Sequence, residues 1–293
     1  MGKIDLHSHS IASVDGEYEP KDLIDLAINS GLKYYAICDH DSVNSLKEAV
    51  NYVKDKDINF IPSIEISAQI DTTPLHILGY NINYEDIKYK LRDEYVKDSN
   101  KKYGKELIQK AKDFGFYFDE NVIYNYRKDH LVCEEIVGDT ILNDKRNDLD
   151  ERLLPFRKGN ELSDNPSFNF FKHFCTIGKP LYIPYSFNMP IKEASELIHS
   201  TNGKMFLAHP AHNIKHDLNL LHSIMDYNLD GIEVFSSYHN KQDIEFYYEQ
   251  AKKNNLYMSV GSDFHGKSKP AIKLGSIDYD EDELDKTVRY ILC

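Results

Sequence analysis

Short apolar runs alternate with amphipathic stretches in the first third of the chain. The runs have the length and residue types of buried strands, and the stretches between them carry apolar residues at helical spacing. Leu23, Ile24 and Ala27 fall on one side of a helix that Pro20 would open. The predicted strands are Lys3 to His7, Lys33 to Cys38, Ile58 to Ile70 and Leu75 to Ile82, and the helices are Pro20 to Ser30 and Val43 to Lys54. Strands separated by helices in this way favour parallel βαβ units.

The pattern changes after Tyr84. Residues 85–114 predict one long charged helix, and few strand-like runs follow before residue 180. The alternation then returns, with strands at Leu181 to Pro184, Met205 to Ala208, Gly231 to Phe235 and Leu256 to Val260, and helices at Ile191 to Thr201, 241–253 and Asp282 to Leu292. We therefore expect an α/β fold in which residues 1–84 and 180–293 form one domain and residues 85–179 form a mostly helical insertion domain.

Composition restricts the possible partners. The chain has 293 residues, of which 41% are hydrophobic, so it can bury a large core. Its net charge of -13 argues against a stable complex with long nucleic acid, although metal ions could reverse the charge locally for a short anionic substrate. No apolar segment approaches the ~20 residues of a membrane span. The four cysteines are scattered without a CxxC pair, which is typical of reduced thiols, and we expect a cytoplasmic protein. The sequence does not predict the oligomeric state.

Histidines and carboxylates recur where the predicted strands end. Six of the 13 histidines lie at or just after such ends, namely His7, His9, His40, His76, His209 and His265. The carboxylates beside them are Asp15, Asp39, Asp41, Glu65 and Asp263. Because the carboxyl ends of parallel strands in a barrel meet on one face, these side chains are expected to converge. In an extended segment, residues i and i+2 also share a face, as in His7-Ser8-His9 and Asp263-Phe264-His265.

A single histidine at a strand end is usually a polar residue satisfied by hydrogen bonds. The repetition here favours a metal site, because burying so many ionisable groups together without a cation would be costly. Imidazole and carboxylate ligands without thiolates suit zinc, manganese or iron. Two or three such ions, joined by a bridging carboxylate, would lower the pKa of a water and clamp phosphoryl oxygens, so that a metal-activated hydroxide attacks phosphorus.

Several ordered motifs then resemble the polymerase and histidinol phosphatase (PHP) superfamily of metal-dependent phosphoesterases. They are His7-Ser8-His9-Ser10, Asp39-His40-Asp41, Ile64-Glu65-Ile66-Ser67, His76-Ile77-Leu78-Gly79-Tyr80, Ala208-His209-Pro210, Gly231-Ile232-Glu233-Val234 and Gly261-Ser262-Asp263-Phe264-His265-Gly266. The resemblance implies a distorted (β/α)7 barrel with two or three metal ions. It is strongest to a branch with a helical insertion, whose members remove phosphate from 3′,5′-bisphosphonucleotides or trim short RNA from the 5′ end.

The resemblance also implies a ligand set. It places His7, His9, Glu65 and Asp263 around a first metal, and makes Glu65 a bridge to a second metal that His76 and His209 also bind. Asp15, His40 and His265 would form a third site or face the substrate. In one departure from the superfamily pattern, Asp15-Gly16 lies one residue later after the HxH motif than is usual.

Further residues are candidates for catalysis or substrate binding. We expect catalytic roles for Asp263 and His265. His239 is either a proton donor in catalysis or a loop histidine without a catalytic role. Glu233 could support a ligand or form a structural ion pair. The substrate-binding candidates are Arg127, Lys128, His130, His212 and Lys267. For the first three, the alternative interpretation is an exposed, solvated loop.

The sequence thus predicts a metal-dependent phosphoesterase acting on nucleotides or short oligonucleotides. Histidinol phosphate is an alternative substrate in the same reaction class. An amidohydrolase acting on C–N bonds is an alternative of another class, although no lysine is clearly placed as a carbamylated bridge and Glu65 occupies the bridging position. A non-catalytic metal-binding domain is a third alternative.

Overall fold

The computed structural model describes residues 3–266 and 269–293. The chain divides into two compact units. We call the first the barrel unit; it consists of Met1–Asp93, Asn188–His265 and Ile272–Cys293. The second, the helical unit, consists of Glu94–Phe187 and Gly266–Ala271. The division falls inside the long helix α3 (Ile87–Asp113), and a short segment after His265 also belongs to the helical unit.

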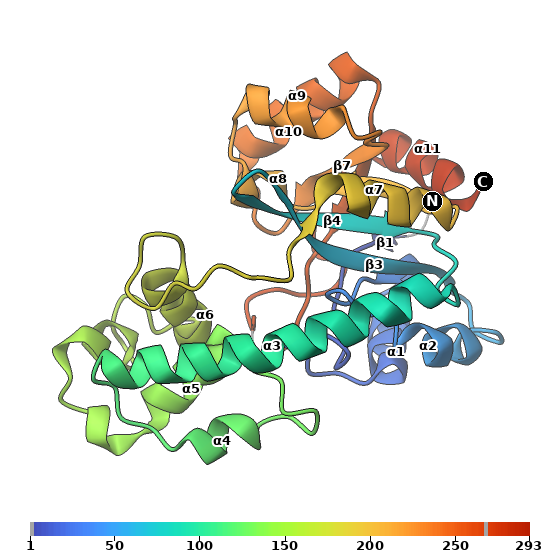
Figure 1. Cartoon of the computed structure of the whole chain (residues 1–293). Helices are drawn as coiled ribbons and strands as arrows, with labels where there is room; N and C mark the ends of the chain where they lie inside the picture. Colours follow the sequence, from blue (N-terminus) through green and yellow to red (C-terminus); the bar gives the residue numbers. More distant parts are fainter. Residues whose placement is uncertain (1–2, 267–268) are drawn as a thin grey trace. The chain divides into compact units, whose positions relative to one another are not determined.

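A twisted, nearly closed sheet forms the centre of the barrel unit (Figure 1). Its strands, in spatial order, are β1 (Lys3–Asp5), β2 (Leu32–Ile37), β3 (Asn59–Ile70), β4 (Thr73–Tyr80), β6 (Lys204–Leu207), β7 (Gly231–Ser236) and β8 (Tyr257–Gly261). The short β5 (Met189–Pro190) pairs with β3. The two ends of the sheet meet. The Leu6 amide donates to the Val260 carbonyl (2.9 Å), and Ser8 forms an isolated parallel β-bridge with Phe264. The predicted distorted barrel is confirmed.

Strand β4 makes the barrel irregular. It runs antiparallel to both neighbours, whereas the other pairs of main strands are parallel. Only two residues separate β3 from β4, and a turn that short can join antiparallel strands but not parallel ones. His76 consequently lies within β4, opposite Ser67, and not at a strand end as predicted.

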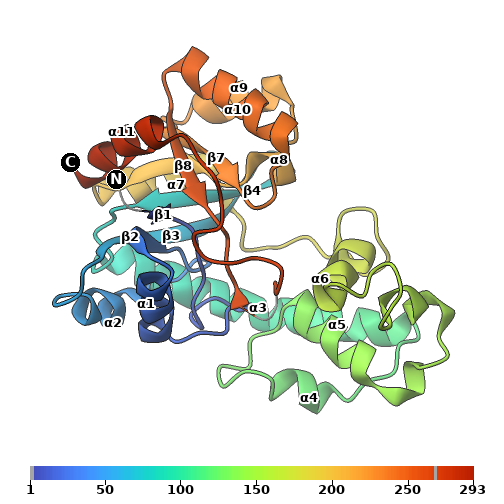
Figure 2. The same ribbon diagram turned by 180° about the vertical axis from the view of Figure 1, so that it is seen from behind.

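Helices cover the outside of the sheet in the barrel unit (Figures 1 and 2). Helix α1 packs on β2, α2 on β3, α7 on β3 and β6, α10 on β7 and α11 on β8. The apolar side of the first helix is buried through Leu23, Ile24 and Ala27, as its spacing predicts. The helices are α1 (Pro20–Asn29), α2 (Leu46–Tyr52), α7 (Ile191–Ser200), α8 (Pro210–Asn213), α9 (Leu218–Met225), α10 (Lys241–Asn254) and α11 (Glu281–Leu292).

The helical unit has its own aromatic core, in which the rings of Phe116, Phe156, Phe170 and Phe174 pack together. Besides its part of α3 it contains α4 (Glu120–Tyr124), α5 (Glu134–Asn143), η1 (Lys145–Asn147), η2 (Glu151–Phe156), α6 (Pro166–Phe170) and the π-helical turn η3 (Phe171–Cys175). The prediction of a strand at Leu181 to Pro184 is wrong. Pro180 and Pro184 lack the amide donors of a ladder, and the Leu181 amide donates to the Phe174 carbonyl instead.

Two features bear on the expected environment of the protein. Cys38, Cys133 and Cys175 are buried as free thiols, and Cys293 is exposed. None of the helices in the described part of the chain combines the length and the apolar character that crossing a membrane requires.

Candidate metal centre

All nine metal-ligand candidates converge in the barrel unit. Three overlapping groups have ligand atoms within 4.8 Å of one another. The first group is His7, His9, Glu65 and Asp263; the second is His40, Glu65 and His76; the third is His9, Asp15, His40 and His265. His209 joins them through its Nε2, which lies 3.0 Å from Oε1 of Glu65.

In the first group, four ligand atoms surround one point. Nε2 of His7 lies 3.2 Å from Oε2 of Glu65 and 3.3 Å from Oδ1 of Asp263. Nε2 of His9 lies 3.2 Å and 2.9 Å from the same two oxygens. The two Nε2 atoms are 3.1 Å apart. Ligands bound at about 2.0–2.2 Å to a tetrahedral ion would be roughly 3.3–3.6 Å apart, so the group has nearly the spacing of a coordination shell.

Hydrogen bonds on the far side of each ring fix which nitrogen faces this point. Nδ1 of His7 donates to the Glu233 carboxylate at 2.9 Å, so its Nε2 presents a lone pair. Nδ1 of His9 lies 2.9 Å from Oγ of Ser13, whose hydroxyl donates to Asp39. The Ser13 oxygen is therefore the acceptor, and Nε2 of His9 also presents a lone pair. With both rings neutral, two lone pairs and two carboxylate oxygens would face one another and repel, so this point favours positive charge, supplied either by imidazole protons or by a metal ion.

Glu65 lies between two sets of imidazoles and is fully buried. Its Oε2 lies 3.1–3.2 Å from nitrogens of His7, His9 and His40, and its Oε1 lies 3.0–3.1 Å from His76 and His209. Among the described residues Oε2 has no hydrogen-bond partner despite these close nitrogens. One oxygen directed to each set is the geometry that a bridging carboxylate requires.

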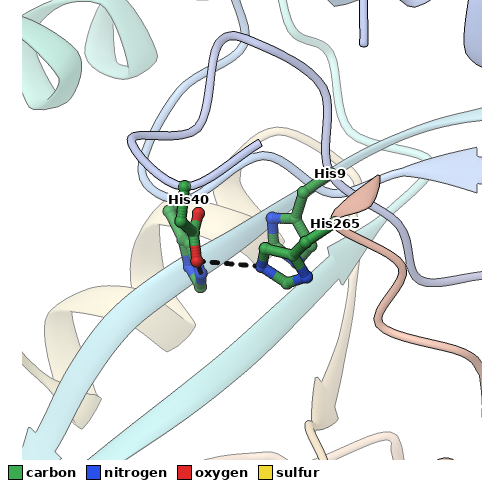
Figure 3. A group of neighbouring side chains, drawn as sticks. His9, His40 and His265 are labelled. Carbon is green, nitrogen blue, oxygen red and sulfur yellow. Dashed lines mark ion pairs between the residues drawn. The ribbon is translucent and has the colours of Figure 1, made fainter. Parts of the chain in front are cut away.

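The third group lies beside the first. Figure 3 shows His9, His40 and His265 gathered, with the rings of His9 and His265 facing each other (centroids 4.0 Å apart). Nδ1 of His265 donates to the Asp263 carbonyl, which directs its Nε2 to Oδ2 of Asp15 at 3.0 Å. Gly16, directly after Asp15, lies so close to Ser10 that a Cβ there would come within 1.9 Å of the Ser10 carbonyl oxygen, so this position requires glycine.

The carboxylates favour positive charge in the cluster. Burial by itself lowers the pKa of His9, but the nearby carboxylates of Asp263 and Glu65 outweigh burial and raise the pKa to about 9. Burial by itself raises the pKa of Glu65. The nearby imidazoles of His7, His76 and His40 outweigh burial and lower that pKa well below its usual value. His40 differs, because burial lowers its pKa to about 3. A divalent cation would supply this positive charge in place of the imidazole protons.

Two ligand candidates have strained backbones. The φ angles of His209 and Asp263 are 25° and 54°, in the region that favours glycine. Oε2 of Glu233 accepts a hydrogen bond from the His209 amide at 2.9 Å, while its Oε1 binds His7. The Asp263 amide donates to the His7 carbonyl at 2.9 Å. Such strain persists only where the surroundings fix the conformation, and it is typical of functional sites.

Sequence reasoning missed several residues that organise this centre. The Tyr238 hydroxyl donates to Oδ2 of Asp263 at 2.6 Å, and Ser13 holds both the His9 ring and the His40 amide. Asp39 and Asp41, the carboxylates on either side of His40, are expected from the sequence to converge with the histidines, but they accept hydrogen bonds from loop and strand residues and are absent from the three groups. For Tyr238, the signal in the sequence is its position shortly after the predicted strand Gly231 to Phe235.

The other candidates have different surroundings. In His239, Nδ1 donates to the Val234 carbonyl and Nε2 accepts from the Ala211 amide, so neither nitrogen is available to a leaving group in this conformation. His212 is exposed, and its ring lies 5.1 Å from that of Tyr238 and 5.8 Å from that of His209.

In the helical unit, Arg127 forms a bidentate pair with Asp129, Nδ1 of His130 donates to the Tyr124 carbonyl, and Lys128 is exposed. Lys267 lies outside the described residues. A role of these four residues toward substrate stays a prediction.

The donor set fits a multinuclear centre. It offers imidazole nitrogens with fixed tautomers, carboxylate oxygens and a buried bridging carboxylate, which are ligands for zinc, manganese or iron. Divalent ions held there would provide Lewis acids for hydrolysis of a phosphate or carboxylic ester or amide.

Comparisons with known proteins place the chain in a family. The PHP domain family matches residues 5–291. The chain is 27% identical to the 5′-3′ exoribonuclease Rnm of Salmonella typhimurium, over 92% of this chain and 87% of that protein. It is 25% identical to the 3′,5′-nucleoside bisphosphate phosphatase of Chromobacterium violaceum, over 90% and 88%.

Two solved structures share the fold. One, described as an amidohydrolase of Chromobacterium violaceum, has a TM-score of 0.81 and 20% identity over 99% of this chain and 96% of that one. The other, described as a metal-dependent phosphoesterase of Bifidobacterium adolescentis, has a TM-score of 0.77 and 21% identity over 99% and 95%.

Proposed function

The chain belongs to the PHP domain family, and on that premise we propose that it hydrolyses phosphate esters of nucleotides or short oligonucleotides at a multinuclear metal centre. The observation that carries this proposal is the convergence of the His7 and His9 lone pairs on Oε2 of Glu65 and Oδ1 of Asp263. The nucleotide substrate class is supported by the two relatives named above, each matched over most of its length.

We assign the ligands as follows. His7, His9, Glu65 and Asp263 would hold one ion, and Glu65, His76 and His209 a second. Asp15, His40 and His265 would hold a third. Bound ions would activate a water and neutralise the charge that develops on the phosphoryl oxygens.

The chain's own residues orient this centre. Glu233, Ser13, Asn213 and the Asp263 carbonyl each accept a hydrogen bond from an Nδ1 atom, which keeps the opposite Nε2 directed inward. We assign Asp263 and His265 to metal binding at the reaction centre. His239, whose ring joins β7 to α8 through Val234 and Ala211, would act in positioning. The exposed imidazole of His212 is our candidate for contact with the nucleotide.

The test is phosphate release by the manganese-reconstituted protein from adenosine 3′,5′-bisphosphate, AMP, histidinol phosphate and p-nitrophenyl phosphate. We expect a preference for the bisphosphate. Asp263→Asn should abolish turnover and lower the manganese content while leaving the circular dichroism spectrum unchanged. Full activity of this variant would contradict the metal assignment.

The other outcomes identify the alternatives. Preference for histidinol phosphate would establish the alternative substrate. Release from none of the four compounds would overturn the proposal, and a panel of amides would then separate an amidohydrolase from a non-catalytic metal-binding domain. Manganese, zinc and iron should each be supplied in turn, because the ligand types fit all three.

A further inference from the structure

Arg92 is a buried cation that the metal centre does not include. It lies in α3, is only 6% exposed, and belongs to the barrel unit. Its Nε and Nη2 lie 2.9 Å and 2.8 Å from the same oxygen, Oδ1 of Asp41. Its Nη2 also donates to the Ser67 carbonyl at 3.2 Å. One guanidinium therefore joins a helix, the loop after β2 and strand β3.

Both partners of Arg92 are neighbours of ligand candidates. Asp41 directly follows His40, and Ser67 lies two residues after Glu65, on the same face of β3. The Asp41 amide donates to the Glu65 carbonyl at 2.8 Å, and the Asp41 carboxylate accepts from the Ser67 amide at 3.2 Å. The positions of His40 and Glu65 relative to each other thus depend on Asp41.

Asp41 needs a partner to hold this conformation. Its φ of 53° is unfavourable for a residue with a Cβ, and its side chain is buried. A carboxylate buried without a cation would be strongly destabilising. A second hydrogen bond ties the same loop to α3, since Nδ2 of Asn44 donates to Oδ1 of Asp93 at 3.1 Å.

We propose that Arg92 is a positioning residue for the metal centre, which fixes the His40 loop against the Glu65 strand through Asp41 and Ser67. A lysine could not replace it fully, because an ammonium lacks the planar fork that reaches both the carboxylate and the carbonyl. The proposal concerns metal binding and rests on the proposed function only for its kinetic readout.

The test compares Arg92→Lys, Arg92→Met and Asp41→Asn with a matched control, Arg157→Met. Arg157 is a half-buried arginine of the helical unit whose guanidinium donates to the carbonyls of Leu142 and Asn147. For each full-length variant we would measure manganese affinity and stoichiometry by calorimetric titration, kcat and KM for adenosine 3′,5′-bisphosphate, and Tm in the presence of EDTA.

We expect Arg92→Lys, Arg92→Met and Asp41→Asn each to weaken manganese binding about ten-fold or more and to lower kcat, with KM changed by less than about two-fold. Arg157→Met should lower Tm while manganese affinity stays at the wild-type value. Arg92→Met combined with Asp41→Asn should recover Tm relative to Arg92→Met alone, because the buried carboxylate charge is gone, but should not recover manganese affinity.

Wild-type manganese affinity and kcat in Arg92→Lys and Arg92→Met would overturn the proposal. Equal loss of manganese affinity in Arg157→Met would also overturn it, because the effect would then be general destabilisation. If Arg92→Met does not fold, the lysine variant and Asp41→Asn decide the question. A wild-type protein that binds manganese but releases no phosphate would refute the proposed function and leave the binding comparison intact.

Discussion

The hydroxyl group of Tyr238 donates a hydrogen bond of 2.6 Å to Oδ2 of Asp263. This leaves Oδ1 of Asp263 directed to Nε2 of His7 and His9. The ring of Tyr238 meets that of His209 edge to face, with centroids 5.3 Å apart. One tyrosine therefore contacts a carboxylate of the first ligand group and the imidazole of His209, which lies beside Glu65.

Tyr238→Phe should weaken the centre without unfolding the protein. The ring contact with His209 is kept, but Asp263 loses the donor that holds Oδ2 away from the ion. We expect manganese affinity to fall about ten-fold and kcat to fall with it, as is usual when a residue supporting a ligand is removed. Calorimetric titration and steady-state kinetics measure both. An unchanged manganese affinity would show that Asp263 keeps its orientation without this hydrogen bond.

Glu233→Gln should be more damaging, by about 10–100-fold in metal affinity. The carboxylate accepts from both the His7 ring and the His209 amide, whereas an amide has one accepting oxygen and a donating NH2 group. One of the two ligands must therefore lose its support. Glu245→Gln, on the exposed part of α10, is the matched control and should bind manganese like the wild type. Equal affinities of the two variants would disprove this role.

Gly261→Ala tests how closely β8 approaches the centre. A Cβ at this position would come within 2.2 Å of both Oε1 of Glu233 and Cβ of His7. We expect a loss of about 1–3 kcal/mol in the free energy of unfolding, together with weaker metal binding. Gly159→Ala, in an open part of the helical unit with a φ of 89°, should cost stability alone. Urea denaturation and manganese titration of both variants distinguish the two effects.

The ion pair between His199 and Asp230 (2.9 Å) predicts a pH-dependent contribution to stability away from the metal centre. The hydrogen bond to Asp230 raises the pKa of His199, although partial burial opposes this shift. Burial by itself would raise the pKa of Asp230, but the hydrogen bonds from His199 and Tyr290 outweigh burial and lower that pKa. The histidine contribution is therefore complete below its unfolded pKa of about 6.5 and lost as pH rises through the higher folded pKa. The aspartate contribution is lost in acid, as pH falls below about 4.

His199→Gln should consequently destabilise the protein by roughly 0.5–1 kcal/mol near pH 5.5, a modest value because the histidine is partly exposed. The difference from the wild type should shrink by pH 9. Urea denaturation of both proteins at the two pH values, with EDTA present, makes the comparison. A difference that stays constant between pH 5.5 and 9 would mean that the charge of His199 does not contribute.

The sequence predicts much of this protein because its signals are local. Alternating apolar runs predict the barrel strands, and the loss of that alternation after Tyr84 predicts a change to helix. His7 and His9 share a face because any extended segment places residues i and i+2 together. The nine ligand candidates follow strands or lie on them, and strands of one barrel must bring them to a common region.

The tertiary structure decided what depends on distant partners. The antiparallel course of β4 places His76 beside Glu65 from within a strand, and the loop after His9 brings Asp15 to His265. Glu233, Tyr238 and Arg92 look like ordinary strand, loop and helix residues in the sequence. Their roles arise from hydrogen bonds to His7, Asp263 and Asp41, which lie 226, 25 and 51 residues away. A side chain's residue type fixes which bonds it can form, but only the folded chain determines which partner lies within 3 Å.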